Sequence, residues 1–229
     1  MPVQHPFRPA LFRFLRDLAA NNERAWFQAH KGEYEDSVRG PAREFVAACA
    51  PLFERLSPHV VADPRPVGGS LFRIHRDVRF SKDKRPYKTF AGIQFRHAEG
   101  RDAHAPGYYL HLEPGNVFAG LGIWHPDAAT ARRLRAAIAD DAEGWKRATR
   151  GKRFGARFEL AGDSLQRPPA GFDREHPLIE DLKRKDFIAV AKLTQKDVTG
   201  AGFARSFVGL CERGTPLMRF LCSALGLPF

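Results

Sequence analysis

The spacing of apolar residues predicts helices at the start of the chain. A first helix is indicated by residues at the i, i+3, i+4, i+7 positions of one face, namely Leu11, Phe14, Leu15 and Leu18. Asn21 and Asn22 end this helix, and either can cap a second helix that extends to a break at Gly40 and Pro41. A third helix follows, with Phe45, Cys49, Leu52, Phe53 and Leu56 on its apolar side.

The pattern then changes to a period of two, which is typical of β-strands. Strands are predicted at residues 71–80, 90–96, 107–113 and 117–124, and their short connections favour an antiparallel meander. Further on, the pattern predicts a helix after Asp127, a short strand near Arg157–Leu160, a strand at Phe187–Leu193 and two C-terminal helices. We therefore expect an α+β fold, with N-terminal helices, a central antiparallel β-meander of about four strands and C-terminal helices. Residues 1–229 are expected to form a single domain with its core signature at 70–124.

Composition is that of a globular protein, with 43% apolar and 28% charged residues. The sequence contains neither a leader-like N-terminus nor an apolar run of about 20 residues, so we expect a cytoplasmic protein that does not enter a membrane. The cysteines Cys49, Cys211 and Cys222 fall in helical patterns without metal-ligand spacing and are expected to be buried free thiols. The oligomeric state does not follow from the sequence.

Positive charge is concentrated in one segment. The whole chain has a formal net charge of +11, and residues 70–88 contain seven basic and two acidic side chains. Such a segment suits an anionic small molecule, a nucleic acid or an acidic protein partner. A compositional bias toward Arg would also raise the total charge, so the position of the basic residues carries more weight than their number.

A strand at 71–80 would divide its side chains between two faces. Arg73, His75, Asp77 and Arg79 would share one face, whereas Phe72, Ile74, Val78 and Phe80 would be buried on the other together with Arg76. Asp77 would have a lowered pKa and would orient the arginines for an anion. The predicted ligand-binding residues are Arg73, Arg76, Arg79, Lys82, Asp83, Lys84, Tyr87, Lys88, Tyr109 and Arg24. A solvated polar face with internal Arg–Asp pairs and an exposed basic turn is the alternative explanation.

Four further side chains are candidates for catalysis. His75 and Asp77, and likewise His111 and Glu113, are spaced i, i+2, so each pair lies on one side of its own strand. Adjacent strands would bring the pairs together, as general base and acid or as ligands of a divalent metal. Because the flanking Arg73 and Arg79 would repel a cation, we predict no metal. No cofactor is predicted either.

A polar and aromatic cluster, Asn22 to Trp26, has two interpretations. Asn22 as a helix cap and Trp26 in the core explain it structurally. Alternatively, Arg24 or Lys31 reaches over the sheet toward the cationic face.

Three segments resemble one known family. They are NNERAWFQAHKGEYE (21–35), SLFRIHRDVRFSKDKRPYK (70–88) and PGYYLHLEPG (106–115), and they are similar to signatures of the domain-of-unknown-function family 2461 (DUF2461). The resemblance implies a compact α+β domain that fills the whole protein. It implies no activity and no catalytic residues.

Familiar catalytic motifs are absent from the sequence, including the G-x-x-x-x-G-K-[ST] phosphate loop, H-E-x-x-H and G-x-S-x-G. The leading hypothesis is that the domain binds a phosphate-bearing or polyanionic ligand on its cationic segment. One alternative is a hydrolase or phosphoryl-group enzyme that uses His75 or His111 as its base. The other is a basic module that binds an acidic protein.

Overall fold

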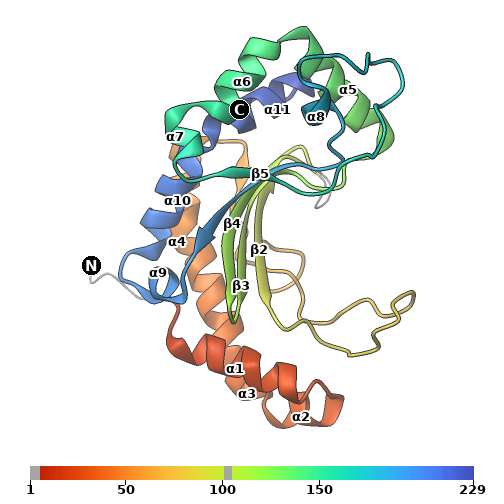
Figure 1. Cartoon of the computed structure of the whole chain (residues 1–229). Helices are drawn as coiled ribbons and strands as arrows, with labels where there is room; N and C mark the ends of the chain where they lie inside the picture. Colours follow the sequence, from red (N-terminus) through yellow and green to blue (C-terminus); the bar gives the residue numbers. More distant parts are fainter. Residues whose placement is uncertain (1–5, 101–104) are drawn as a thin grey trace.

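The computed structural model describes residues 6–100 and 105–229 (Figure 1). Its helices are α1 (Pro9–Ala20), α2 (Arg24–Ala29), α3 (Lys31–Tyr34), the π-helical turn η1 (Glu35–Arg39), α4 (Gly40–Leu56), α5 (Ala128–Asp140), α6 (Ala142–Arg150), α7 (Lys152–Gly155), α8 (Ile179–Leu182), α9 (Gln195–Thr199), α10 (Phe203–Arg213) and α11 (Thr215–Ala224). Its strands are β1 (Val60–Val61), β2 (Ala91–His97), β3 (Gly107–Glu113), β4 (Asn116–Ile123), β5 (Glu159–Ala161) and β6 (Phe187–Leu193). The predicted α+β fold, with helices at both ends of the chain, is confirmed.

In the described residues, six strands form one antiparallel sheet in the order β1-β2-β3-β4-β6-β5. The β2-β3-β4 meander agrees with the prediction to within a residue or two at each end. The sheet has more strands than expected because β6 and β5 extend it beyond β4 and the two-residue strand β1 extends it beyond β2.

The strand predicted at 71–80 is wrong. In this segment only Leu71 and His75 form isolated bridges, to Ile93 and Tyr87 respectively. Residues 73–88 instead leave the sheet as an extended excursion, which we call the arm and which projects to one side in Figure 1. Alternation cannot distinguish a sheet strand from such an arm, because both are extended backbone. Phe80, expected to be buried, is 95% exposed.

The break predicted at Gly40 and Pro41 is also wrong, because the chain continues from η1 directly into α4. Pro41 cannot donate the usual helical hydrogen bond, and its ring crowds the preceding turn. The wider π-helical turn ahead of it accommodates the proline. Gly40 allows close packing there, since a Cβ at this position would lie 2.9 Å from the carbonyl oxygen of Glu35.

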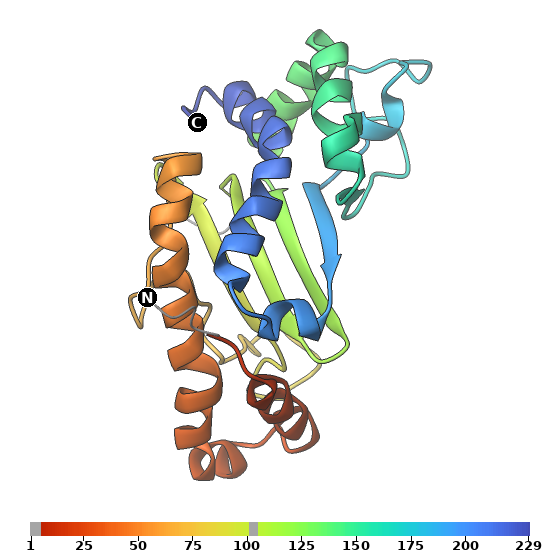
Figure 2. The ribbon, with the colours of Figure 1, turned by 90° about the vertical axis from the view of Figure 1, so that its left-hand side faces the viewer.

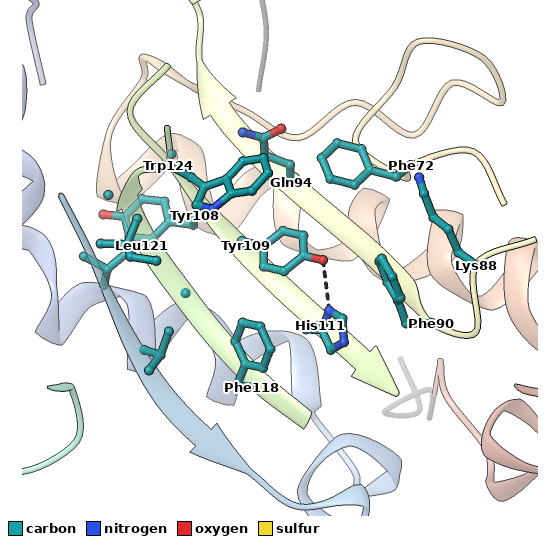
Figure 3. A pocket seen from close by; sticks show the side chains of 15 residues that line it. Phe72, Lys88, Phe90, Gln94, Tyr108, Tyr109, His111, Phe118, Leu121 and Trp124 are labelled. Carbon is teal, nitrogen blue, oxygen red and sulfur yellow. Dashed lines mark hydrogen bonds between the residues drawn. The ribbon is translucent and has the colours of Figure 1, made fainter. Parts of the chain in front are cut away.

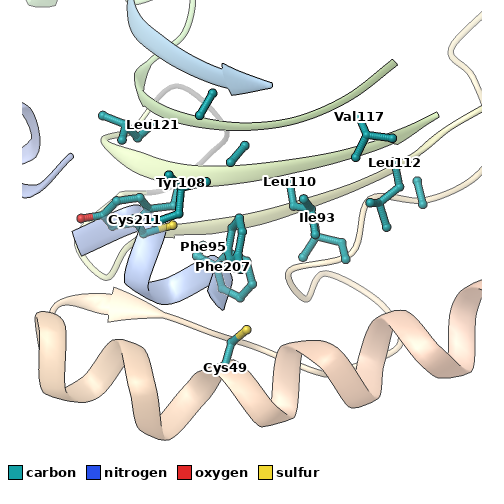
Figure 4. Packing of buried hydrophobic residues seen from close by; sticks show 14 of the residues in the cluster. Cys49, Ile93, Phe95, Tyr108, Leu110, Leu112, Val117, Leu121, Phe207 and Cys211 are labelled. Atoms are coloured by element: carbon teal, nitrogen blue, oxygen red, sulfur yellow. The ribbon is translucent and has the colours of Figure 1, made fainter. Parts of the chain in front are cut away.

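Helices α4 and α10 cover one face of the sheet (Figure 2). Aromatic rings fill the space between them and the strands, and Figure 4 shows Phe95 facing Phe207. The ring centroid of Phe95 lies 5.6 Å from that of Phe207 and 4.6 Å from that of Phe53. Cys49 and Cys211 are buried free thiols in the same layer, as predicted. Each fully buried Phe contributes about 2–3 kcal/mol of hydrophobic free energy. This layer packs against one face of the sheet, so the opposite face is available for a binding site.

Candidate functional site

A cavity of about 430 Å³ lies on the sheet face opposite α4 and α10 (Figure 3). Antiparallel pairing places cross-strand neighbours on the same face. One row across the sheet is Gln94, Tyr109, Gly120 and Val190, and the adjoining rows contain His111 beside Phe118 and Gly107 beside Gly122 and Ile188. All of these residues line the cavity. The register of β2, β3, β4 and β6 therefore creates its floor.

Two glycines of this floor, Gly122 and Gly120, lack side chains that would otherwise occupy space, but for different reasons. Gly122 has a φ of +119°, and a Cβ there would lie 2.1 Å from the carbonyl oxygen of Phe187, so the backbone itself requires glycine. Gly120 has no such requirement. A Cβ on Gly120 would meet only ordinary contacts, the closest at 3.7 Å to the Cβ of Tyr109. The missing side chain at Gly120 therefore leaves space in the cavity without relieving a clash.

Aromatic side chains form most of the walls. Phe118 and Tyr109 rise from the floor, while Phe72 and Phe90 come from the segments on either side of the arm (Figure 3). Trp124, just beyond the end of β4, closes another side and is 51% exposed. These walls offer flat apolar surfaces to a ligand.

Three polar side chains of β3 form a hydrogen-bonded relay along the floor. The Tyr109 hydroxyl lies 3.0 Å from His111 Nδ1, and His111 Nε2 lies 3.2 Å from Glu113 Oε2. A carboxylate only accepts, so Nε2 carries the proton and Nδ1 accepts from the tyrosine. Thr89 and Asn116 also donate to Glu113.

Burial sets the protonation of this relay. It lowers the pKa of His111 in spite of Glu113, so the imidazole is neutral at pH 7. It also raises the pKa of Tyr109 well above its ordinary value. Burial alone would raise the pKa of Glu113, but hydrogen bonds from Asn116 and His111 hold it below its ordinary value. The relay thus consists of a neutral tyrosine hydroxyl (Tyr109), a neutral imidazole (His111) and a carboxylate (Glu113).

Lys88 brings positive charge to the rim of the cavity. Its Nζ donates to the carbonyl oxygen of Arg73 at 2.9 Å and lies 5.4 Å from the centroid of the Phe72 ring. Burial, and secondarily the charge of Arg73, lower the pKa of Lys88. Among the described residues, neither Lys88 nor Arg73 forms a salt bridge. The rim therefore carries a partly desolvated ammonium group, that of Lys88, which has no carboxylate partner among the described residues.

The arm's two acidic residues form ion pairs with three of its arginines. Asp77 pairs with Arg79 at 2.6 Å, and hydrogen bonds from Arg79 lower the pKa of Asp77 to about 2. Asp83 accepts from Arg85 at 2.8 Å and from Arg76 at 2.5 Å, which hold its pKa well below the ordinary value. The lowered pKa of Asp77 was predicted, but it fixes one guanidinium group rather than two.

The remaining lysines of the arm are not ion-paired in the described part of the chain. Lys84 donates to the carbonyl oxygen of Val78, and the exposed Lys82 has no hydrogen bond within residues 6–100 and 105–229. The cations of the arm that have no carboxylate partner among the described residues are therefore Arg73, Lys88, Lys82 and Lys84, and one further positive charge remains on Arg76 and Arg85, which share Asp83.

The two predicted catalytic pairs are separated. His111 and Glu113 belong to the relay, whereas Asp77 lies on the arm with Arg79. His75 packs at the base of the arm, with its ring centroid 5.2 Å from that of Tyr87. The expected four-residue cluster required a sheet strand at 71–80, which the fold lacks. No group of three or more His, Cys, Asp or Glu suited to a metal ion occurs among the described residues.

Two other predicted ligand-binding residues lie outside the cavity lining. Tyr87 is 2% exposed and stacks on Phe27 with 4.2 Å between centroids, so its ring serves to anchor the arm. Arg24 is exposed at the start of α2, and no hydrogen bond joins it to another described residue.

Asn22 has a role that the sequence did not indicate. The cap of α2 is Glu23, so the predicted cap is wrong. Instead, the buried Asn22 amide donates to the Tyr87 carbonyl and accepts from the Tyr87 N–H, both at 3.0 Å. It thereby fastens the arm to the N-terminal helices across 65 positions of sequence.

A second unpredicted feature is the pair His125 and Asp186. His125 Nδ1 lies 2.5 Å from Asp186 Oδ1, which also accepts from the His125 N–H at 2.8 Å. The buried Asp186 further accepts from the N–H of Asp163 at 2.9 Å. His125 has a φ of +48° and stacks on Trp124, a wall of the cavity. The sequence drew attention to this region only through the helix predicted to begin after Asp127.

Comparisons with known proteins bear on the family alone. A search of curated proteins and a search of solved structures each gave no significant match. In residues 6–100 and 105–229, no helix is long and apolar enough to cross a membrane. The family model described as "Conserved hypothetical protein (DUF2461)" matches residues 10–220 of the 229. The chain therefore belongs to the DUF2461 family, as its three signature segments indicated.

Proposed function

We propose that the protein binds a phosphate-bearing ligand whose apolar body occupies the cavity and whose negative charge lies against Lys88 and Arg73. The observation that carries the proposal is the position of Lys88, a partly buried residue that lines an aromatic cavity and whose ammonium group has a carbonyl oxygen as its hydrogen-bond partner. Arg76, Arg79 and Arg85 contribute less, because each is already ion-paired with an aspartate.

Electrostatics favour an anion at this rim. Partial burial of Lys88 destabilises its charged form, as its lowered pKa reflects. An anion in contact with Lys88 and Arg73 would reverse this effect, because charge-assisted hydrogen bonds are stronger where water is partly excluded. The aromatic walls would meanwhile exclude water from the ligand's body.

Phenyl phosphate is a suitable probe, since it joins a flat apolar ring to a phosphate. Its binding should change the fluorescence of Trp124 and should weaken about tenfold in Lys88→Met, which keeps the aliphatic chain but loses the charge. Lys88→Arg should retain binding. Lys82→Met removes the same charge from a position outside the cavity and is the matched control. Equal affinity of Lys88→Met and Lys82→Met for phenyl phosphate would refute the proposal.

Gly120→Leu tests the position of the ligand's body. A Cβ fits at Gly120, so the leucine side chain should extend into the cavity and abolish phenyl phosphate binding without unfolding the protein. Circular dichroism and the unfolding midpoint would verify the fold. A folded Gly120→Leu protein with unchanged affinity would place the ligand elsewhere.

The Tyr109–His111–Glu113 relay favours a second candidate function, hydrolysis of a phosphate or carboxylic ester. His111 is neutral and hydrogen-bonded on both nitrogens, with Tyr109 exposed to the cavity as an acid. Purified protein would be assayed with 4-nitrophenyl phosphate, bis(4-nitrophenyl) phosphate and 4-nitrophenyl acetate. Turnover that is lost in His111→Gln and Tyr109→Phe would support this function, and turnover that persists in both would exclude the relay.

A further inference from the structure

The cavity and the arm meet at Lys88. Phe72, which directly precedes the arm, and Lys88, the last residue of the arm, both line the cavity. Lys88 is bonded to the carbonyl oxygen of Arg73, the first arm residue. From this junction the arm extends away from the sheet (Figure 1). A ligand anchored in the cavity that is longer than the cavity itself would therefore meet the arm.

The arm is held in a defined conformation at its base and along its length. At its base, Asn22 forms two hydrogen bonds with Tyr87, and Lys88 N–H donates to the carbonyl oxygen of Ile74 at 2.8 Å. Farther out, the Arg76–Asp83 pair and the bond from Lys84 to Val78 join its two limbs. The unpaired cations of the arm are consequently presented by a braced scaffold.

Aromatic surface occurs at both ends of this cationic path. The cavity offers the rings of Tyr109, Phe118 and Trp124. The far end of the arm offers Phe80, which is 95% exposed, with the Arg79 guanidinium 5.8 Å from its centroid. A large apolar ring in this position is not explained by packing within the described residues. Alternating π surfaces and unpaired cations match a ligand in which flat rings alternate with phosphates.

We infer that the site takes a short single-stranded nucleic acid, with one base in the cavity, the phosphates along Arg73, Lys88, Lys84 and Lys82, and a further base against Phe80. This inference rests on the proposed function, because it identifies the phosphate-bearing ligand. A single strand is required, because bases inside a duplex are stacked and paired and cannot enter a cavity. DNA and RNA share this chemistry, and both belong in the test.

An anionic membrane is the competing partner for a basic arm with an exposed Phe. It would leave the aromatic cavity unused, and one Phe offers little apolar area for insertion. Stable membrane attachment generally needs a broader apolar face or a second anchor. The joint presence of cavity, cations and Phe80 favours the nucleic acid.

Fluorescence anisotropy with 5′-labelled dT8 and rU8 tests the inference. The octamer should bind at least tenfold more tightly than thymidine monophosphate, because it also engages the arm. Four phosphate contacts predict that the logarithm of the association constant falls with the logarithm of salt concentration with a slope of about −3. Lys82→Glu should weaken octamer binding and make that slope shallower by about 0.7. The matched control is Lys152→Glu on α7, away from the arm.

Phe80→Ser tests the arm's stacking position. It should weaken octamer binding about tenfold, within the range for loss of one base–aromatic contact, and leave thymidine monophosphate binding unchanged. Val67→Ser, which alters another exposed apolar residue at 82% exposure, should change neither affinity. Because Phe80 is exposed, the fold should tolerate its replacement.

The outcomes separate this inference from the proposed function. If thymidine monophosphate binds in a Lys88-dependent manner but the octamer binds no more tightly, the cavity takes a small phosphate and the nucleic-acid inference fails. If neither ligand binds, and phenyl phosphate does not bind either, both proposals fail. Equal affinity for a duplex of the same length, or tighter binding to vesicles containing 30% phosphatidylserine than to the octamer, would also overturn the inference.

Discussion

Replacing Asn22 with Ala should detach the arm from the N-terminal helices. The buried amide makes two hydrogen bonds of 3.0 Å with the backbone of Tyr87, one in each direction. The substitution removes both bonds and leaves a buried N–H and a buried C=O without their partner. Each net hydrogen bond is worth about 0.5–1.5 kcal/mol, and a buried group left unsatisfied costs about 1–3 kcal/mol.

We therefore expect the free energy of unfolding to fall by about 2–4 kcal/mol. For a protein of this size the corresponding fall in Tm is roughly 4–16 °C. Urea denaturation followed by circular dichroism gives the first quantity and calorimetry the second. Because Asn22 fastens the arm in particular, limited trypsin digestion should also cleave the arm faster in the variant.

The neighbouring Asn21 provides a matched control. It is exposed, and its side chain makes one local hydrogen bond, to the carbonyl oxygen of Asp17 at 2.9 Å. Asn21→Ala should therefore cost less than about 1 kcal/mol. If Asn22→Ala and Asn21→Ala lower the free energy of unfolding equally, or if the arm's rate of cleavage is unchanged, the clamp has no energetic importance and this reasoning is refuted.

Three further predictions concern the sheet and the site. Gly122→Ala should lower the free energy of unfolding by at least about 2 kcal/mol, because φ is +119° and the new Cβ would clash with the carbonyl group of Phe187. In the same urea titrations, Gly120→Ala should change the free energy of unfolding by less than about 1 kcal/mol. Since the folded-state pKa of His111 is lowered, its contribution to stability is fully present above the unfolded pKa near 6.5 and is lost as pH falls toward the folded value. Measured between pH 7.5 and 5.5, the free energy of unfolding should thus fall less steeply in His111→Phe than in the wild type, and an unchanged slope would argue against a buried neutral imidazole. His125→Ala should cost about 1–2 kcal/mol more than His125→Asn in thermal unfolding, because Asn tolerates the left-handed backbone at φ +48°; equal losses would contradict a strained backbone there.

The local pattern of apolar and polar residues was sufficient to predict a strand or helix where neighbouring elements cover one of its faces. The alternation at 107–113 and Phe187–Leu193 agrees with β3 and β6, since those strands must bury alternate side chains against the helices. The same reasoning failed at 71–80. That segment alternates equally well, yet it lacks continuous hydrogen-bonded partners on either side and so becomes an arm. Alternation records which side chains point the same way, and it does not record whether a strand lies alongside.

The candidate site shows the same division. His111 and Glu113 were correctly placed on one face because they lie two positions apart on one strand. The cavity required the register of β2, β3, β4 and β6, which sets residues distant in sequence side by side. Asn22 with Tyr87, and His125 with Asp186, are likewise separated by more than 60 positions. Nothing in their local sequence indicates either contact.

The sequence by itself therefore determined the fold class, the family, the concentration of positive charge at residues 70–88 and the shared strand face of His111 and Glu113. These features depend on composition, periodicity and short spacing, which are properties of neighbouring residues. Tertiary structure alone decided which arginines pair with aspartates, which glycines leave space for the cavity and where the arm is attached to the rest of the fold. Those outcomes depend on contacts closed by the packing of the whole chain, because hydrogen bonds, ion pairs and burial act over a few ångströms in space and are indifferent to distance along the sequence.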